Sequence, residues 1–238
     1  MTSPFNPYQA PIAESLPSVA AGDFDIGRCV TDAFERMKQN PMLPIGVLIV
    51  GQLLMMISMF TVVGIFLALP VFVWGLTKFF LNLHDQRQPQ TNDLFAGFAN
   101  YWTVVGRVLL VLVSFFLLAL LGESAMLVGE ATKSVPLSVI GFLVYLSFFL
   151  FVLSRFYFAL FFVVDRNLPA LEAMSASWRL LQGKSLKMAG FVFVAALVSS
   201  AGVLALCIGI LFTIPMSYLM YVSAYRQAAG YGPPPGQA

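Results

Sequence analysis

The stretch "MLPIGVLIVGQLLMMISMFTVVGIFLALPVFVWGLTKFFL" occupies residues 42–81 and contains no acidic residue and only one basic residue, Lys78. A helix needs about 20 consecutive apolar residues to cross about 30 Å of hydrocarbon. Because the stretch is long enough for two such crossings, we divide it near residues 59–64. It predicts two membrane-spanning helices in succession and assigns the chain to the membrane proteins.

The composition of the whole chain supports this class. The 238 residues are 59% hydrophobic and 10% charged, and their mean hydropathy is +0.86. Soluble domains are about 45–50% apolar and about 25% charged, and a water-soluble protein of this size could not bury so much apolar surface. The net charge of +2 gives no indication of a nucleic-acid partner. We therefore expect an all-α integral membrane helical bundle.

Three further apolar runs complete the predicted topology. Residues 102–121 form one span that carries Arg107, and residues 137–164 form another that carries Arg155. Residues 188–222 are too long for one straight helix, so we divide this run at its small residues, which are Ser199, Ser200, Gly202 and Gly209. The total is six membrane segments, unless the two divided runs enter and leave on one side as re-entrant hairpins buried against neighbours.

The distribution of basic residues orients these six segments. Ten of the thirteen Lys and Arg residues fall on the side that holds both chain ends: Arg28, Arg36, Lys38, Lys78, Arg87, Arg166, Arg179, Lys184, Lys187 and Arg226. The opposite side has only Lys133. Basic residues prefer the cytoplasmic side of a membrane. We expect a multi-pass membrane protein with both termini in the cytoplasm.

A repeated heptapeptide indicates an internal duplication. "GIFLALP" occupies residues 64–70, and "GILFTIP" occupies residues 209–215. Phe34 and Trp178 lie 144 positions apart, as do Gly46 and Gly190. A near-constant offset favours two parallel pseudo-repeats over compositional coincidence, with repeat halves at about 26–83 and 168–226.

Each heptapeptide begins with glycine and ends with proline. Pro70 and Pro215 lack a backbone N–H and free a carbonyl one turn earlier, while Gly64 and Gly209 allow close approach between helices. We expect helix breaks at these four residues. Each break is either a kink that packs against a neighbour or an unwound segment that lines a site.

Amphipathic segments at 26–39, 91–102 and 168–182 are predicted to lie along the cytoplasmic membrane surface. In the third, the apolar face includes Leu171, Met174, Trp178 and Leu181. Asn167 is expected to cap its start and Gly183 its end.

The chain ends differ from the membrane domain at 25–226. Residues 1–24 and 227–238 are rich in proline and polar residues and are predicted to be disordered tails. A Pro-rich tail can also dock to a protein partner. Cys29 and Cys207 are not expected to pair.

The segment "RFYFALFFVVDRNLPALEAMSASWRLLQGK", residues 155–184, carries a family resemblance. Its pattern is an arginine in a span, an acid at the span's end and an E-A-x-x-x-S helix that ends in glycine, here Arg155, Asp165, Glu172, Ala173, Ser177 and Gly183. The chain resembles the membrane domain of bacterial glycerophosphoryl diester phosphodiesterases and its uncharacterised stand-alone relatives. The resemblance implies a helical domain in the bacterial inner membrane without a defined chemistry. The catalytic domain of these enzymes would need about 250 further residues.

No catalytic constellation is recognisable in the sequence. The single histidine, His84, stands in "NLHDQRQ", which we expect to be a solvated loop. No acid lies deep in a predicted span, and neither a nucleophile motif nor a metal-ligand spacing is present. We predict that the protein is not an enzyme and has no catalytic, cofactor-binding or metal site.

Arg155 is the unusual residue. If its helix leaves the membrane at Asp165, Arg155 lies about 15 Å deep, where an arginine costs about 2.5–3.5 kcal/mol and requires a partner or water. The candidate partners are Gln52, a carbonyl freed by Pro70 or Pro215, or a lipid phosphate. With Arg107, these residues form the predicted lipid-binding or buried polar site.

Two functions remain open. The first is a non-enzymatic membrane protein that interacts with membrane lipids and self-assembles into a homo-oligomer through its Phe-rich surfaces. The alternative is a channel, pore or transporter for a small solute or lipid, which the duplication and the Gly–Pro elements would suit.

Overall fold

The computed structural model describes residues 23–230 except 61, 133–134 and 205–207. Every element in this part of the chain is a helix. In order, they are α1 (Ile26–Gln39), α2 (Met42–Met59), α3 (Val62–His84), the 3-10 helix η1 (Thr91–Asn100), α4 (Tyr101–Thr132), α5 (Val135–Phe156), α6 (Ala159–Asp165), α7 (Ala170–Leu180), α8 (Ser185–Leu204) and α9 (Ile208–Ala228). The predicted all-α class is confirmed.

Several of these helices are suited to a bilayer. Within the described residues, five are long and apolar enough to cross a membrane: Met42–Met59, Gly64–His84, Thr91–Leu117, Val135–Val152 and Ser185–Gly202. The protein is therefore a multi-pass membrane protein. The sixth predicted crossing falls on α9, whose first turn adjoins residues outside the described ranges, and it stays a prediction.

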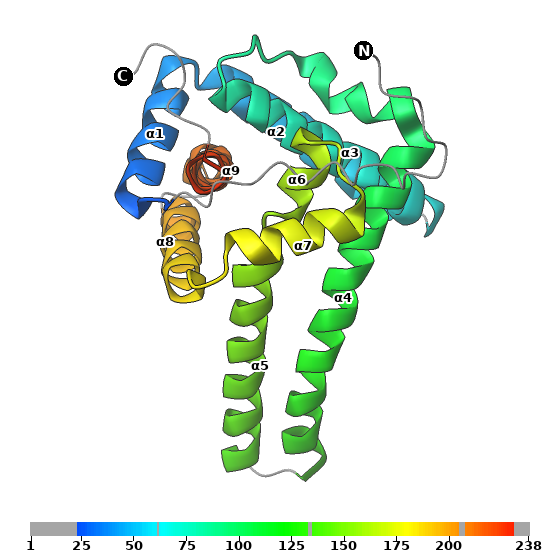
Figure 1. The fold of residues 1–238 in the computed structure, drawn as a ribbon, viewed down its shortest axis with the longest axis vertical. Helices are drawn as coiled ribbons and strands as arrows, with labels where there is room; N and C mark the ends of the chain where they lie inside the picture. Colours follow the sequence, from blue (N-terminus) through cyan, green and yellow to red (C-terminus); the bar gives the residue numbers. More distant parts are fainter. Residues whose placement is uncertain (1–22, 61, 133–134, 205–207, 231–238) are drawn as a thin grey trace, which may run out of the picture.

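Helices α4 and α5 pack along each other and form a hairpin that extends beyond the rest of the molecule (Figure 1). Only 11% of the Val135–Val152 window of α5 is buried. Its exposed large apolar side chains include Leu137, Val139, Ile140, Phe142, Leu143 and Val144. We refer to α4 and α5 together as the hairpin.

Helix α9 occupies a different position, because other helices surround it. It is seen end-on in Figure 1, so its axis runs across the long axis of the hairpin. It packs against α1, α8 and α3. Its buried side chains include Met216, Leu219, Met220, Val222, Ala224 and Tyr225. We call α9 with α1, α3, α6 and α8 the α9 body.

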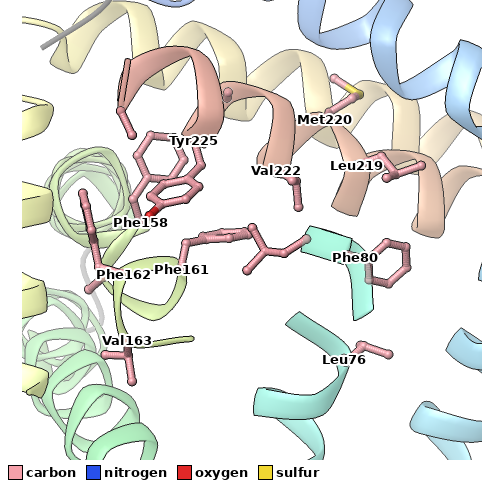
Figure 2. Close-up of a cluster of buried hydrophobic side chains, with 14 of the residues drawn as sticks. Leu76, Phe80, Phe158, Phe161, Phe162, Val163, Leu219, Met220, Val222 and Tyr225 are labelled. Carbon is pink, nitrogen blue, oxygen red and sulfur yellow. The ribbon is translucent and has the colours of Figure 1, made fainter. Parts of the chain in front are cut away.

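Aromatic rings fill the centre of the α9 body (Figure 2). The ring of Tyr225 lies 5.4 Å from that of Phe161 in a stacked arrangement and 5.2 Å from that of Phe162 in an edge-on one. Phe80 of α3 stacks on Tyr218 of α9 at 4.9 Å. Such pairs add about 0.5–1.5 kcal/mol each beyond the burial of their area, so these rings fix α6 and α3 against α9.

Helix α1 begins and ends where the sequence predicts. The carboxylate of Asp25 caps it by accepting from the backbone N–H of Arg28 at 2.8 Å. Cys29 and Ala33 are buried in the core. The larger side chain of Phe34 is half exposed. The smaller side chains of α1 therefore let this helix approach α9 closely.

Residues assigned to the tails take part in this packing. Phe24 is buried, and its ring lies edge-on to Phe191 at 5.8 Å. The side-chain oxygen of Gln227 accepts from the backbone N–H of Asp25 at 2.9 Å. The folded region therefore includes Phe24 and Gln227, while residues 1–22 and 231–238 lie outside the described residues, as does Cys207.

The first predicted division of an apolar run is confirmed, since α2 ends at Met59 and α3 begins at Val62. Of the two alternatives for the prolines, the unwound segment is wrong, because Pro70 and Pro215 lie inside continuous helices, and the packed kink stays a prediction. Both prolines are buried, and neighbouring helices stabilise a proline-containing membrane helix. Gly64 and Gly209 lie near the starts of these helices rather than at breaks.

The predicted span at 137–164 is also divided. Helix α5 ends at Phe156, and the short helix α6 follows from Ala159. The chain turns here because Phe158 and Phe162 are buried around Tyr225 instead of continuing along α5. The helices of the two predicted repeats occur in the same order, α1–α2–α3 and α7–α8–α9, but the duplication itself stays a prediction.

Candidate lipid-facing site at the junction of α5 and α7

Helix α7 runs across the end of the hairpin that adjoins the α9 body (Figure 1). The structure confirms a helix here, and its inward face consists mainly of small side chains: Ala170, Ala173, Ala176, Ser177 and Leu180. Of the residues predicted to face the membrane surface, Leu171 is 71% exposed and Met174 and Trp178 are partly exposed, and their contact with lipid stays a prediction. Only Leu181 of that set is buried. Because the inward side chains are mostly alanine, α7 can approach α6 closely.

Arg155 lies in the last turn of α5, directly against α7. Its Nη1 donates to the backbone carbonyl of Leu181 at 3.2 Å. Its guanidinium lies 4.8 Å from the ring centre of Trp178 and 5.8 Å from that of Phe151. In return, the hydroxyl of Ser177 donates to the carbonyl of Arg155 at 2.9 Å. Arg155 thus joins the end of α5 to the end of α7.

This geometry corrects the predicted depth and partners of Arg155. The helix ends at Phe156, one residue later, so Arg155 is not ten residues inside a continuous helix. Its protein partner is the carbonyl of Leu181 rather than Gln52 or a carbonyl near either proline. The carbonyls at a helix C-terminus lack intrahelical donors and carry partial negative charge, which makes them suitable partners for a guanidinium.

Arg107 fixes the segment that precedes α7. Its Nη1 donates to the backbone carbonyl of Asn167 at 2.7 Å and also to the side-chain oxygen of the same residue. Asn167 has a φ of +54°, a conformation that asparagine tolerates better than most residues. Asn167 is therefore not the helix cap, and Pro169 occupies that position. Gly183, with a φ of +79°, follows the helix end as predicted.

The predicted site residues therefore fall into two groups. Arg107 and Arg155 lie close to the two ends of the 167–181 segment. Gln52 is on α2, where it is exposed and does not meet either arginine. The structure separates the predicted constellation because α2 packs against α3 rather than against α5 or α7.

A buried ion-pair cluster lies at the end of α9. The sequence analysis did not predict it. Arg226 is only 5% exposed. Its Nε and Nη2 donate to the two carboxylate oxygens of Asp85 at 3.0 and 2.6 Å. Its Nη1 and Nη2 donate to the two oxygens of Asp165 at 2.8 and 2.9 Å. The cluster connects α9 to the segment after α3 and to the end of α6.

Two further side chains complete this cluster. The hydroxyl of Tyr225 donates to Asp165 at 2.9 Å, and Nδ1 of His84 lies 3.4 Å from Asp85. The predicted solvated position of His84 is wrong, because this residue is the last of α3 and is 5% exposed. Burial alone would raise the pKa of the Asp85 carboxyl, but the hydrogen bond from His84 and the charge of Arg226 lower it below its usual range.

The signal for this cluster was present in the sequence in weak form. An acid stands at the end of each of two apolar runs, and an arginine stands at the end of a third. A buried ion is stable only when it is paired, so opposite charges at neighbouring helix ends can meet. No group of three or more potential metal ligands occurs within the described ranges.

Comparison with family models, with curated proteins and with solved structures found no match in any of the three. The resemblance to the membrane domain of glycerophosphoryl diester phosphodiesterases therefore stays a prediction.

Proposed function

We propose that this chain is a non-enzymatic multi-pass protein of the bacterial inner membrane that interacts with lipid and self-assembles into a homo-oligomer. The observation that carries the proposal is the exposed apolar surface of the hairpin, where 11% of the Val135–Val152 window is buried. Burying apolar surface stabilises by about 25 cal/mol per Å². Lipid acyl chains, or a second copy embedded among them, supply the surface that the chain itself does not.

The end of the hairpin supports a membrane–water boundary at α7. Arg107, Arg155 and Trp178 lie there together with the exposed Leu171. Basic and aromatic side chains concentrate at the interface, where lipid headgroups provide phosphates. An amphipathic helix that crosses the end of a span is suited to lie in this layer. The proposed cytoplasmic position of both termini follows from the basic residues on this side.

A lipid phosphate is the proposed ligand of Arg155. Its Nε is buried without a hydrogen-bond partner among the described residues, while Nη1 binds the carbonyl of Leu181. A guanidinium has five donors in a planar arrangement that suits phosphate. The membrane supplies that anion at the level of α7, so a small movement of Arg155 would allow it to bind a headgroup.

The proposed absence of catalysis rests on how the reactive groups are used. Asp85 and Asp165 are both bound to Arg226, and His84 is turned toward Asp85. These groups stabilise the junction of three helix ends rather than lie free for acid–base chemistry. The alternative, a channel or transporter, has its support in the two helix triplets of the same order, an arrangement used in transporters with parallel repeats.

The proposal can be tested with purified protein in vesicles of phosphatidylethanolamine and phosphatidylglycerol. Native mass spectrometry should show oligomers that retain phospholipid. Arg155→Leu should reduce the retained phosphatidylglycerol several-fold, and Arg155→Lys should restore part of it, because a point charge cannot make the bidentate contact. The matched control is Arg87→Leu, since Arg87 is mostly exposed beside Asp85.

Monomers without bound lipid would contradict the proposal. Equal lipid retention in the Arg155→Leu and Arg87→Leu variants would remove the assigned role of Arg155. Conductance or tracer flux across the same vesicles, absent in protein-free controls, would favour the channel or transporter instead.

A further inference from the structure

Arg36 is a buried arginine without an anionic partner among the described residues. It lies in the last turn of α1 and is 5% exposed. Its Nη1 is buried without a hydrogen-bond partner in that part of the chain, and its guanidinium forms no ion pair there. Arg226 is equally buried, yet its guanidinium donates to both oxygens of two carboxylates. Of these two arginines, only Arg226 has its anions within the described chain.

The acidic side chains closest to Arg36 in the sequence are used elsewhere. Asp32 lies one turn before Arg36 on α1, but its carboxylate accepts from the hydroxyl of Ser223 at 2.9 Å. Glu35 is exposed. The carboxylates of the ion-pair cluster are bound to Arg226. An arginine keeps its positive charge inside a protein, and a buried charge is costly unless it is paired. A bound anion would supply the missing partner.

The position of α1 indicates which anions can reach Arg36. Directly before α1, the carboxylate of Asp23 lies 2.7 Å from Nζ of Lys187, in the first turn of α8, which is apolar and long enough to cross a membrane. Helix α1 ends at Gln39, and α2, another such helix, begins at Met42. An amphipathic helix held between the starts of two spans is suited to lie at the level of the lipid headgroups. Arg36 lies on this helix.

The surroundings of Arg36 favour a lipid phosphate over a soluble ion. The residues that share the buried face of α1 are apolar: Cys29, Ala33 and Met37. A phospholipid places its phosphate at the edge of an apolar layer, whereas a free phosphate ion would give up its hydration to reach the same position. A guanidinium suits either ion, because its donors lie in one plane and can bind two phosphate oxygens.

From these observations we infer that Arg36 binds the phosphate group of an anionic phospholipid, with Nη1 as a donor to a phosphate oxygen. This is a lipid site separate from that of Arg155. The inference rests on the proposed function, because it requires that the chain interacts with lipid. Phosphatidylglycerol is preferred to phosphatidylethanolamine, since the ammonium group of the latter would bring a second positive charge to the site. A soluble phosphate would make the same contact, so the tests compare both sources.

The first test measures thermal unfolding of the full-length protein in maltoside micelles, which contain no phosphate, with and without phosphatidylglycerol. At about 100 times its Kd, the lipid should raise the Tm of the parent protein by about 5–10 °C. Arg36→Met should lose most of this rise. Without lipid, its Tm should equal or exceed that of the parent, because the substitution removes a buried charge that lacks a partner.

Three variants serve as controls for this assay. Lys38→Met removes a positive charge from the same helix at an exposed position, and it should keep the full rise in Tm. Arg36→Lys should keep part of the rise, because a point charge cannot make the bidentate contact. Arg226→Met should lower the Tm with and without lipid, because its anions belong to the chain.

A second test counts bound lipid directly by native mass spectrometry. Arg36→Met should lose a single bound phosphatidylglycerol per chain, whereas Lys38→Met should lose none. Combining Arg36→Met with Arg155→Leu should reduce the retained lipid further than either substitution alone, because the two arginines are proposed to hold different lipid molecules.

Inorganic phosphate separates the two sources of the ligand. If it raises the Tm of the parent as much as the lipid does, and Arg36→Met abolishes both rises, Arg36 binds phosphate and the lipid is rejected as its source. Equal rises with phosphatidylglycerol in Arg36→Met and Lys38→Met would overturn the assignment to Arg36. A lower Tm of Arg36→Met without lipid would also contradict it, because Arg36 would then stabilise the fold without a bound anion.

The lipid counts distinguish failure of this inference from failure of the proposed function. If the parent protein retains phospholipid and Arg36→Met retains the same amount, the Arg36 site is rejected while lipid interaction stands. If the parent retains no phospholipid, the proposed lipid interaction fails and the Arg36 site fails with it.

Discussion

The hairpin and the α9 body are built from the same apolar residue types, but the hairpin exposes them and the α9 body buries more of them. In the hairpin, 11% of the Val135–Val152 window is buried, whereas in the α9 body half of the Gly64–His84 window of α3 is buried. Phe142 is exposed on α5, while Phe158, two residues past the end of the same helix, is fully buried. Hydropathy cannot distinguish these two phenylalanines, because lipid and protein interior are equally apolar.

The difference lies in polar chemistry. The α9 body contains polar contacts between helices, such as the partly buried bond between Ser199 and Ser217 at 2.7 Å and the pairing of Arg226 with two carboxylates. The serines of the hairpin, Ser114 and Ser147, bond to carbonyls of their own helices at 2.7 Å. Polar groups that join separate helices therefore mark the protein-facing region.

The largest expected effect comes from breaking the ion-pair cluster. Arg226→Leu leaves the largely buried carboxylates of Asp85 and Asp165 without their cation, which should destabilise the protein by about 3–5 kcal/mol. Steric trapping in bicelles would give the free energy of unfolding. Arg87→Leu, a change at a mostly exposed arginine beside the same cluster, should cost less than about 0.5 kcal/mol. Equal losses would show that the cluster does not stabilise the α9 body.

A matched pair of phenylalanines sharpens the comparison between the two regions. Phe158→Ala should cost about 3–5 kcal/mol, because it opens a cavity beside Tyr225. Phe142→Ala removes the same atoms from an exposed position and should cost less than about 1 kcal/mol in the same assay. A large loss of stability in the Phe142→Ala variant would indicate that the hairpin packs against protein rather than lipid.

Gly75 tests how closely η1 packs on α3. A Cβ at Gly75 would lie 2.1 Å from the backbone carbonyl oxygen of Leu94. Backbone atoms cannot move aside as a flexible side chain can, so Gly75→Ala should cost about 1–3 kcal/mol. Gly106→Ala, which meets nothing, should be neutral or slightly stabilising. Hydrogen exchange of residues 91–100 should rise only in the Gly75 variant, and unchanged protection would contradict the packing.

The pH dependence of stability is the smallest expected effect. The pKa of Asp85 is lower in the folded protein than its usual value of 3.8. The ionised carboxylate therefore stabilises the fold above pH 3.8, and this contribution is lost as the pH falls through the lower folded-state pKa. Thermal unfolding in detergent from pH 7 to pH 2.5 should show this loss, and Asp85→Asn should reduce it. Identical profiles would show that Asp85 is not linked to folding.

Local features of the fold could be predicted from the sequence, and the pairing of helices could not. The limits of α1 and the division between α2 and α3 follow from periodicity and from span length, which depend on neighbouring residues only. The partner of Arg226 depends on residues 61 and 141 positions away. The inward alanine face of α7 was missed because alanine contributes little to an apolar pattern, although it determines how closely two helices approach.

The same holds for the candidate site: the unusual residue could be recognised from its sequence neighbours, but its partner in the fold could not. Arg155 was recognised as unusual because a charge in an apolar run can be seen in the sequence. Its protein partner was predicted incorrectly, since the end of α5 at Phe156 is set by rings that pack around Tyr225. Gln52 was grouped with Arg155 because both are polar residues in apolar runs, yet they lie on separate surfaces.

Contact between the hairpin and lipid can be tested by photolabelling of the native chain in vesicles that contain a phospholipid with a diazirine on its acyl chain. Carbene insertion marks residues that touch lipid, and mass spectrometry locates the adducts without any substitution. We predict dense labelling at residues 137–151 of α5 and little at residues 216–226 of α9. Equal labelling of the two segments, or an unlabelled α5, would contradict the division of this molecule into a lipid-facing hairpin and a protein-facing body.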